Sequence, residues 1–583
     1  MAAKVIILGG GVAGMSAAHE LAERGFSVAV YEQGAIPGGK ARSLDVPGSA
    51  TGGRKPLPGE HGFRFFAGFY KHLPDTMKRI PYKQNPNGVF DNLVPTSEIG
   101  LARFDKPIIV FKADVPWTLN GLKELLRTIF GADTGIPQKE SEFFAKRVWQ
   151  LMTSSAERRL AEYEQLGWWE FLEAETKSAA YVKFFVRSLT RTLVAAHAEI
   201  ASTYTIGNIF LQLFFDIIDP SSDLDRLLNG PTNDVWIDPW LEHLRRAGVE
   251  YHLNARVTGI NCDAEKVVSA TIEKDGHVLD VSGDYYISAL PVEAMAKLVS
   301  DQMIKIDHTL ADVRNLGTKV EWMNGLQIYL KRDVTLIHGH LNYVDSLWSL
   351  TSISQRQFWS EKFDLAQYGD GTVRGIISVD ISDWDNKGLN GLAAKACTKQ
   401  QIFAEVWHQL KRSLNVGGAE ILRDEDVHSY HLDPDIVFEN GPDDPNPEKK
   451  RNIAPLLVNL VNTWGLRPEA YTRIPNLFLA SDYVRTNTDL ASMEAANEAA
   501  RRAVNGIIDL SGAKAPLCKI WKLYEPEIFA FWREQDHRRF AKGLPWREDF
   551  LLVELASPRF WFHLLKYLYV RLRLKLRKWR LGR

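Results

Sequence analysis

Hydrophobic and polar positions at the start of the chain predict a strand, a helix and a second strand. Lys4–Leu8 is a short, largely β-branched apolar run, which is typical of a buried parallel strand. Met15–Arg24 then places apolar residues at helical intervals, and Gly25 closes the predicted helix. Ser27–Tyr31 is the second strand. This order is typical of an α/β domain with a parallel sheet.

Two long segments separate this start from similar apolar runs nearer the C-terminus. The first, residues 107–237, spaces its apolar residues by three and four and predicts mostly helices. The second, residues 300–450, alternates strand-like runs with loops and predicts a sheet. The helices are expected at Leu119–Phe130, Ser141–Met152, Leu160–Leu172 and Ala179–Ala195, and the strands at Val320–Leu330, His338–Leu350 and Thr372–Val379.

The first segment is rich in large apolar side chains. Any one of them is explained by helix packing, but together they favour an apolar pocket or tunnel over a site for a small polar substrate. They are Trp168, Trp169, Phe184, Phe185, Phe210, Leu211, Leu213, Phe214 and Phe215.

The end of the chain combines aromatic and basic residues. Residues 517–583 hold 14 aromatics, about twice the average density of the chain, and residues 566–583 hold eight Lys or Arg and no acid. Leu565, Leu568, Tyr569, Leu572, Leu576 and Trp579 fall on one helical stripe. A basic amphipathic helix of this kind is typical of a membrane-surface element. The alternatives are a nucleic-acid-binding tail, a solvated terminal helix or, over residues 571–576, a strand.

Composition and charge exclude several classes of protein. The 583 residues are 45% hydrophobic and 25% charged, which excludes disordered, collagen-like and coiled-coil chains and suggests about three lobes or one large two-domain enzyme. The formal net charge of −1 offers no global basic field for nucleic acid. Removing the eight cations of the tail leaves −9 for residues 1–565. The three cysteines lie far apart and favour a reducing compartment, and we expect neither a secretory signal nor a spanning helix.

The first strand and helix carry a glycine pattern that binds dinucleotides. Gly9, Gly11 and Gly14 follow in G-x-G-x-x-G spacing, and Glu32 ends the second strand. Gly9 permits the tight turn, Gly11 lets a pyrophosphate approach the backbone, and Gly14 allows close helix–strand packing. Ala13 lies in the same turn, at the helix N-terminus that faces the phosphates. Glu32 can accept from ribose hydroxyls, which favours FAD or NAD over NADP; the alternative is a glycine-rich turn without a ligand.

A second glycine motif, Gly38-Gly39-Lys40-Ala41-Arg42-Ser43, follows the second strand after a short loop. It resembles the second glycine motif of the FAD-dependent amine oxidase and phytoene desaturase superfamily, which implies that Gly39 lies on the cofactor and that Lys40 and Arg42 neutralise phosphate. A surface turn with solvated cations is the alternative. Residues 321–334 and 343–359 look like the corresponding region of plant- and cyanobacterial-type carotene desaturases. Glu60–Phe66 resembles the family segment near the isoalloxazine, so Gly62 is implied at the cofactor, and His61 and Arg64 are candidates for tuning the flavin or moving a proton. Pyrophosphate binding or plain packing explains those two side chains equally well.

Three later segments extend the resemblance, which spans residues 4–510 with interruptions. One of them, Asp284–Pro291, resembles the strand that returns to the dinucleotide domain. Gly248–Val257 looks like the strand whose valine lies by the adenine, so Val257 inherits that role. Asn476–Asp482 and the segment from Ser492 are similar to the last cofactor motif, which implies Asp482 and Met493 as cofactor-binding residues. The family usually has Ala-Gly-Asp where this chain has Ala480-Ser481-Asp482, and we expect a local backbone adjustment there. No metal site is expected.

The resemblance implies an α/β fold with a Rossmann-like FAD-binding domain of the p-hydroxybenzoate hydroxylase/glutathione reductase type. An inserted substrate domain of mixed sheet and helices and a C-terminal helical tail complete it. The predicted parts are FAD-binding segments at 1–106, 238–299 and 451–515, a helical membrane-facing insertion at 107–237, a substrate sheet at 300–450 and the amphipathic tail at 516–583.

The predicted function is FAD-dependent desaturation of a long apolar lipid, a carotenoid or other isoprenoid or a fatty acyl chain. We expect a peripheral enzyme at the cytoplasmic face of a membrane, with no nucleic-acid partner and with quinone or oxygen as electron acceptor. The alternatives are a flavin amine oxidase, a lipid isomerase or dehydroxylase, and a non-catalytic lipid-binding flavoprotein.

Overall fold

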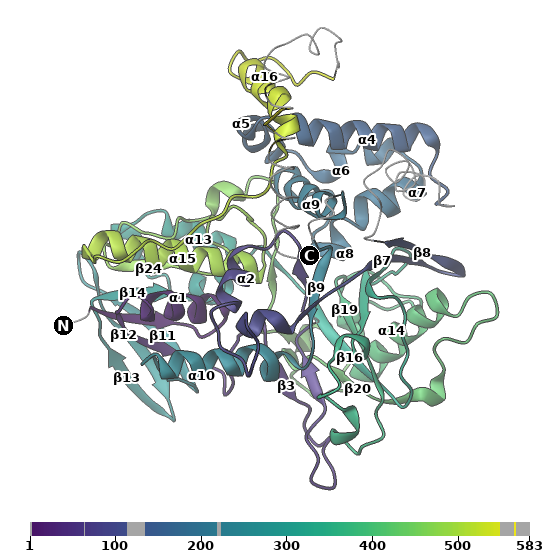
Figure 1. The fold of residues 1–583 in the computed structure, drawn as a ribbon, viewed down its shortest axis with the longest axis horizontal. Coiled ribbons are helices and arrows are strands. Elements are labelled where there is room, and N and C mark those ends of the chain that lie inside the picture. Colours follow the sequence, from purple (N-terminus) through teal and green to yellow (C-terminus); the bar gives the residue numbers. More distant parts are fainter. Residues whose placement is uncertain are drawn as a thin grey trace.

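The computed structural model describes residues 3–62, 64–112, 134–218 and 223–548, together with residues 562, 565, 566 and 569. Three bodies surround one central region (Figure 1): a parallel sheet with its helices near the N-terminus, a larger mixed sheet, and a helical insertion that lies above both in that view. The mixed α/β class is as predicted.

The first body is built on a five-stranded parallel sheet with the order β10-β2-β1-β14-β24. Its strands come from three distant parts of the chain: β1 (Lys4–Leu8) and β2 (Ser27–Tyr31), β10 (Glu250–His252) and β14 (Tyr285–Ser288), and β24 (Leu477–Leu479). Both predicted N-terminal strands are confirmed. Because all five strands are parallel, their carboxyl ends meet at one edge, where ligands bind in open α/β sheets.

Helices and a small sheet complete this body. Helix α1 (Val12–Ala22) packs against α15 (Met493–Ser511), α10 (Asp238–Arg246) and the strands beside it. The helix begins three residues before the predicted Met15, because Gly11 takes an extended conformation and serves as its N-cap. A three-stranded antiparallel sheet is formed by β11 (Ala255–Cys262), β12 (Val267–Lys274) and β13 (His277–Val281).

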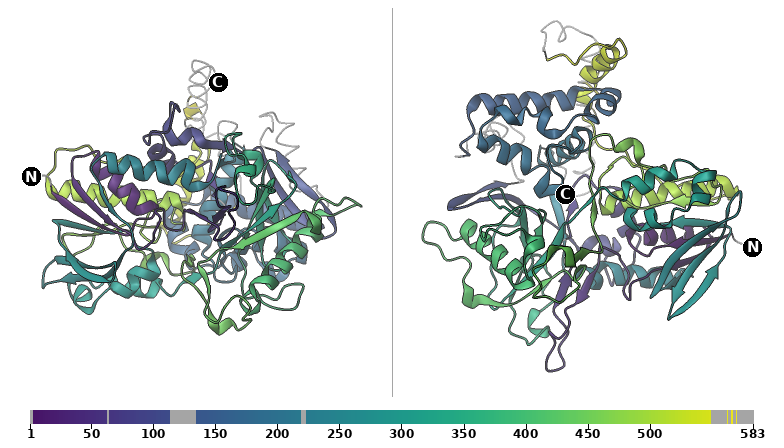
Figure 2. Two further views of the ribbon diagram at one scale, coloured as in Figure 1. Left: turned by 90° about the horizontal axis from the view of Figure 1, so that it is seen from below. Right: turned by 180° about the vertical axis from the view of Figure 1, so that it is seen from behind.

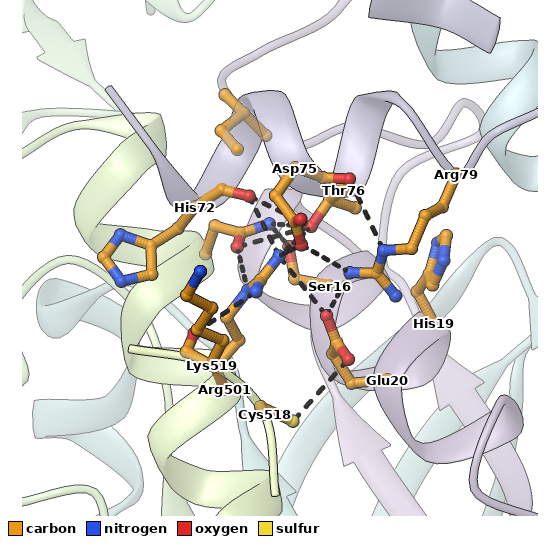
Figure 3. A network of polar contacts seen from close by, with 12 residues as sticks. Ser16, His19, Glu20, His72, Asp75, Thr76, Arg79, Arg501, Cys518 and Lys519 are labelled. Atoms are coloured by element: carbon orange, nitrogen blue, oxygen red, sulfur yellow. Dashed lines mark hydrogen bonds and ion pairs between the residues drawn. The ribbon is translucent and has the colours of Figure 1, made fainter. Parts of the chain in front are cut away.

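A buried polar network fastens α1, α15 and α2 (His72–Met77) together (Figure 3). Arg501 on α15 donates to Asp75 Oδ2 at 2.8 Å and to Thr76 Oγ1 at 2.9 Å, and Arg79 pairs with Glu20 on α1. Although burial raises the pKa of Glu20, the guanidinium groups of Arg501 and Arg79 lower it below its ordinary value. The network holds the three helices as one unit behind the glycine turns.

The second body is a seven-stranded sheet with the order β20-β16-β19-β18-β17-β7-β8, covered on one face by α14 (Lys399–Leu414). Its strands are β20 (Val427–Leu432), β16 (Asn324–Leu330), β19 (Gly375–Ile381), β18 (Leu350–Ser354), β17 (Gly339–Tyr343), β7 (Glu98–Arg103) and β8 (Lys106–Lys112).

The predicted strand runs of this sheet need two corrections. His338–Leu350 is not one strand, because a turn ending at Ser349, whose φ is +51°, separates β17 from β18. Val320–Leu330 is also divided: β15 (Val320–Glu321) pairs with β23 (Leu456–Leu457) in a separate small sheet. Strand β7 pairs in parallel with β17 and therefore belongs to this sheet. The predicted boundary at residue 106 places β7 in the FAD-binding segment instead.

The third body is the helical insertion, formed chiefly by α4 (Gln138–Thr153) and α9 (Thr203–Ile218). The predicted helix at Ser141–Met152 is confirmed. Leu160–Leu172 and Ala179–Ala195 are instead broken into short turns, two of them π-helical (Arg159–Tyr163 and Val182–Arg187). Gly167 interrupts the first with an extended backbone. The helix predicted at Leu119–Phe130 lies outside the described residues.

The C-terminal segment joins the first body to the helical insertion (Figure 2). Cys518 Sγ donates to Glu20 on α1, and Asp536 on α16 (Ala530–Phe540) accepts from Arg158 at 2.9 Å in the insertion. The predicted tail stripe lies outside the described residues apart from Leu565, Lys566 and Tyr569. Among the helices that are described, none has the length and apolar character needed to cross a membrane.

Candidate functional site

Two glycine turns form the floor of a large cavity at the carboxyl edge of the parallel sheet. Gly38 N donates to Gly10 O at 3.2 Å, and Gly11 and Gly38 form a parallel bridge. A Cβ placed on Gly39, whose φ is +58°, would lie 3.0 Å from Gly11 Cα. The turns can therefore touch only because they carry no side chains, and the first amides of α1 stay open to the cavity.

Gly14 lies beneath this floor and does not line the cavity. A Cβ at Gly14 would stand 1.9 Å from the carbonyl oxygen of Gly9, so any larger residue would push α1 away from β1. This is the packing role that the glycine spacing predicts. All the other predicted site residues line the same cavity.

Glu32 ends β2 at the cavity wall, where its carboxylate is held by backbone amides. Oε2 accepts from Gly10 N and Oε1 from Gly34 N, both at 2.7 Å. Tyr251 supports the same turn by donating its hydroxyl to Gly10 O at 2.6 Å. Each carboxylate oxygen retains a second lone pair that can accept a further hydrogen bond, for example from a ribose hydroxyl. That role of Glu32 stays a prediction.

Lys40 and Arg42 both point to carboxylates of distant segments. Lys40 Nζ lies 3.2 Å from Glu293 Oε1, and Arg42 Nη2 lies 3.0 Å from Asp435 Oδ1. Their predicted role in neutralising phosphate stays a prediction, and the structure adds that each cation is already balanced by an acid.

His61 sits between two carboxylates that the sequence did not reveal as its partners. Its Nδ1 lies 2.7 Å from Asp433 Oδ2 and 3.3 Å from Asp435 Oδ2. Burial lowers the pKa of His61, but the carboxylates, Asp433 above all, outweigh burial and raise it. The three side chains offer ligand-type atoms within 4.8 Å of one another, a spacing that also suits a cation. Because Arg42 and Asn324 already satisfy the two aspartates, we interpret the cluster as an ion pair.

Arg64 lies against a buried acid, Glu60. Its Nε is 3.7 Å from Glu60 Oε2, and its side chain is 12% exposed. Burial raises the pKa of Glu60 to about 7, although Arg64 and the hydrogen bonds from Thr232 pull it down. Gly62 beside them is required for space, since a Cβ there would lie 2.6 Å from Asp380 Oδ1.

The last predicted motif carries its serine in an unusual backbone conformation. Ser481 takes φ +114°, in the region that favours glycine, and the expected local backbone adjustment stays a prediction. Its hydroxyl donates to Asp482 Oδ1 at 3.2 Å. Met493 begins α15, where Ser492 Oγ accepts from Ala495 N and satisfies one of the four unpaired amides of that helix end. Asp482, Met493 and Val257 on β11 all line the cavity.

The cavity has a volume of about 1940 Å³ and continues from the glycine floor into the helical insertion. That is well above the roughly 300–1,000 Å³ of an ordinary small-molecule site, so it has room for a cofactor and a second long molecule. Its far end is walled by apolar side chains of α4, α9 and the turns between them: Phe144, Val148, Met152, Phe184, Phe185, Leu189, Leu193, Ile209, Phe210, Leu213 and Phe214.

Several residues of the site were not identified from the sequence. Asp433 and Asp435 flank a proline directly after β20; Asp433 contacts His61, and Asp435 lines the cavity. Asp380, Thr351 and Asn342 line the cavity from strands of the mixed sheet. An Asp-Pro-Asp turn after a strand is a weak signal, and no spacing rule connects it with His61.

Comparison with known proteins identifies the family. The model of the family described as flavin containing amine oxidoreductase matches residues 12–508. The chain belongs to this family.

Relatives in sequence and solved structures of similar fold accompany this match. It is 23% identical over 321 residues to 15-cis-phytoene desaturase of Synechococcus elongatus, covering 51% of this chain and 60% of that protein. It is 24% identical over 432 residues to the chloroplastic/chromoplastic 15-cis-phytoene desaturase of Arabidopsis thaliana, covering 71% of each. The aligned region thus spans less than two thirds of the Synechococcus protein. A structure of putrescine oxidase matches with a TM-score of 0.57 at 14% identity, over 87% of this chain and 99% of that one. A structure of cyclohexylamine oxidase from Brevibacterium oxydans matches with a TM-score of 0.57 at 14% identity, over 88% of this chain and 100% of that one. These two show the shared fold.

The protein is therefore an FAD-dependent oxidoreductase, and the site fits the cofactor. The side-chain-free floor at Gly11 and Gly39 and the open N-terminus of α1 suit a pyrophosphate. Glu32 and Val257 would hold the adenosine end, and Asp482 and the first turn of α15 the flavin end. FAD supplies a hydride acceptor, while the protein supplies orientation and exclusion of water.

Proposed function

We propose that the enzyme desaturates a long apolar lipid, a carotenoid or other isoprenoid or a fatty acyl chain, by removing hydrogen from adjacent carbons. The observation that carries this proposal is the apolar far end of the cavity. Phe144 and Phe185 stack there with ring centroids 4.0 Å apart, and Phe210 meets Phe144 edge to face. A small polar amine would leave this wall unfilled, whereas a hydrocarbon chain would bury it.

The insertion gives the cavity an apolar wall suited to a hydrocarbon chain. Phe184 and Phe185 lie on the π-helical turn Val182–Arg187, and π-helical turns occur often at functional sites. This turn faces α4 and α9, so the wall is made by three segments of one body. The side chains of that wall would hold the lipid in place and keep water from the reacting carbons. The finer fold assignment, a Rossmann-like FAD domain of the type named above, belongs to the same proposal.

We further propose that the protein works as a peripheral enzyme at the cytoplasmic face of a membrane. Phe562, Leu565 and Tyr569, spaced by three and four residues, are helical and each more than 60% exposed. Exposed apolar residues at helical spacing beside a run of cations suit an interface with anionic lipid. The electron acceptor in this proposal is a quinone or oxygen.

Anaerobic titration of the FAD-loaded protein tests the proposal. We expect the flavin absorbance to bleach on addition of a lipid extract and to be unchanged by polyamines such as putrescine. Bleaching by polyamines alone would establish an amine oxidase instead. No bleaching by either would favour a non-catalytic lipid-binding flavoprotein.

A further inference from the structure

A row of polar side chains crosses the cavity face of the seven-stranded sheet. Asp380 on β19 lies opposite Thr351 on β18, and Thr351 lies opposite Asn342 on β17. Residues opposite one another in neighbouring strands share a face, and all three line the cavity. The next position of the row is Leu101 on β7, which packs against the apolar core of the helical insertion. The sheet face therefore changes from polar to apolar in the direction of that insertion.

Thr351 and Arg64 carry buried polar atoms that their protein neighbours do not satisfy. Thr351 is 4% exposed, and within the described part of the chain its hydroxyl has no hydrogen-bond partner. Among those residues, Nε and Nη2 of Arg64 also have no hydrogen-bond partner, although Nε lies within ion-pair distance of Glu60 Oε2 at 3.7 Å. Folded proteins pair nearly all such atoms because an unpaired buried polar group costs free energy. A pure hydrocarbon beside these atoms would offer them no hydrogen-bond partner.

The charges at this end of the cavity indicate which polar group fits. Arg64 is attracted to Asp380, and the Asp380 carboxylate lies against Gly62, next to the Arg64 segment. An anionic ligand would be repelled by Asp380, and a cationic ligand by Arg64. A hydroxyl can donate to one group and accept from another, and it brings no net charge.

We propose that the substrate is a long apolar chain bearing a neutral hydroxyl, which the Thr351 row and Arg64 bind while the chain extends into the helical insertion. This inference rests on the proposed function for the identity of the chain as substrate. The hydroxyl would fix which carbons of the chain lie beside the His61–Arg64 segment, so the polar row would set the position of the bond that reacts.

Paired lipids that differ only in the hydroxyl test the inference. Geranylgeraniol and the hydrocarbon of the same chain without its hydroxyl are compared by displacement of a fluorescent fatty alcohol from the FAD-loaded, full-length protein. We expect the alcohol to bind at least about tenfold more tightly. Thr351→Val, which removes only the hydroxyl of the threonine, should reduce this ratio to about threefold or less and leave the Kd of the hydrocarbon unchanged.

Thr203→Val is the matched control, because Thr203 is also a buried threonine whose hydroxyl is unpaired among the described residues but does not line the cavity. It should leave the ratio unchanged. Equal binding of the two lipids to the wild type would overturn the inference. A Thr351→Val variant that keeps the wild-type ratio of alcohol to hydrocarbon affinity would also overturn it, even if the flavin spectrum of the variant shifts.

Flavin reduction is followed on the same preparations, so that the two proposals fail separately. Selective binding without reduction rejects the proposed desaturation alone, whereas reduction without selectivity rejects this inference alone.

Discussion

At the scale of single residues, the cofactor site places a serine where the backbone favours glycine. Ser481 holds φ +114° directly before Asp482. Positive φ in a residue with a Cβ is strained, and such strain persists at functional sites because the surrounding structure imposes it. The hydrogen bond from the Ser481 hydroxyl to Asp482 offsets part of this strain energy.

Replacing this serine by glycine should stabilise the protein. We expect Ser481→Gly to raise the free energy of unfolding by about 1 kcal/mol, since relief of strain of roughly 1–3 kcal/mol exceeds the lost hydrogen bond and the added flexibility of the unfolded chain. Thermal or urea unfolding measures the change. Gly248, with φ +85° in open space, supplies the reverse control, because Gly248→Ser should destabilise. A destabilised Ser481→Gly would show that the serine is held by contacts rather than strained.

The buried acid Glu60 should make stability depend on pH. Its pKa in the folded protein, about 7, lies above the ordinary 4.5. The contribution of Glu60 to the free energy of unfolding is therefore highest below pH 4.5 and falls as the pH rises to about 7. At 1.36 kcal/mol per pH unit the loss amounts to about 3 kcal/mol. Glu60→Gln should therefore become more stable relative to the wild type between pH 5 and pH 8, as measured by urea unfolding. Glu242→Gln, at an exposed ion pair, controls for loss of one carboxylate, and a Glu60→Gln difference that does not change with pH would contradict the assignment.

At the scale of elements, α1, α2 and α15 depend on one another through the network around Arg501. That side chain is 2% exposed and also lies 3.4 Å from the equally buried Glu20. Removing one member of a buried charged network leaves its partner unpaired, which costs more than the network itself contributes.

Arg501→Met should accordingly destabilise the protein by about 3–5 kcal/mol. Arg246→Met is the matched control, because Arg246 pairs with Glu242 on the surface of α10, and such exposed pairs contribute about 0–1 kcal/mol. Urea unfolding of both variants compares them. A similar, small loss of unfolding free energy in both variants would show that hydrophobic packing can replace the network.

At the scale of the whole molecule, the C-terminal segment continues from a packed part into the predicted amphipathic tail. Residues up to Glu548 contact both the first body and the insertion, and Glu548 itself lies 2.7 Å from Lys146 on α4. The cations of the tail follow beyond residue 565. In the proposed function, the membrane and the cofactor would therefore be bound by separate parts of the chain.

Truncation after Pro558 should release the protein from anionic liposomes and leave bound FAD in place. Each tail cation contributes about 1 kcal/mol near anionic lipid, so loss of eight abolishes binding. Co-sedimentation with liposomes and the flavin spectrum of the supernatant measure the two effects. Unchanged sedimentation would refute the tail as the membrane anchor, and neutral liposomes provide the control.

Local patterns predicted the parts of the fold and site that local physics decides. Gly9, Gly11, Gly14 and Glu32 lie within one strand–helix–strand unit, so their spacing alone places them. The partners of His61 could not be predicted, because Asp433 approaches it only through the pairing of β16 with β20, which no short-range pattern encodes. The broken helices of the insertion were missed because tertiary packing overrides helical periodicity. Whether a predicted cation is free or paired, as for Lys40 with Glu293, likewise depends on contacts hundreds of residues apart.

The central claim is that this cavity brings a long apolar chain to the flavin and removes two hydrogens from it. The most direct measurement is an anaerobic single turnover of the FAD-loaded protein with its co-purified or added lipid, followed by mass spectrometry of the extracted lipid. We predict that each reduced flavin accompanies one lipid molecule lighter by two hydrogens, with a new carbon–carbon double bond. Flavin reduction with the lipid recovered unchanged, or only with an amine as reductant, would contradict the claim.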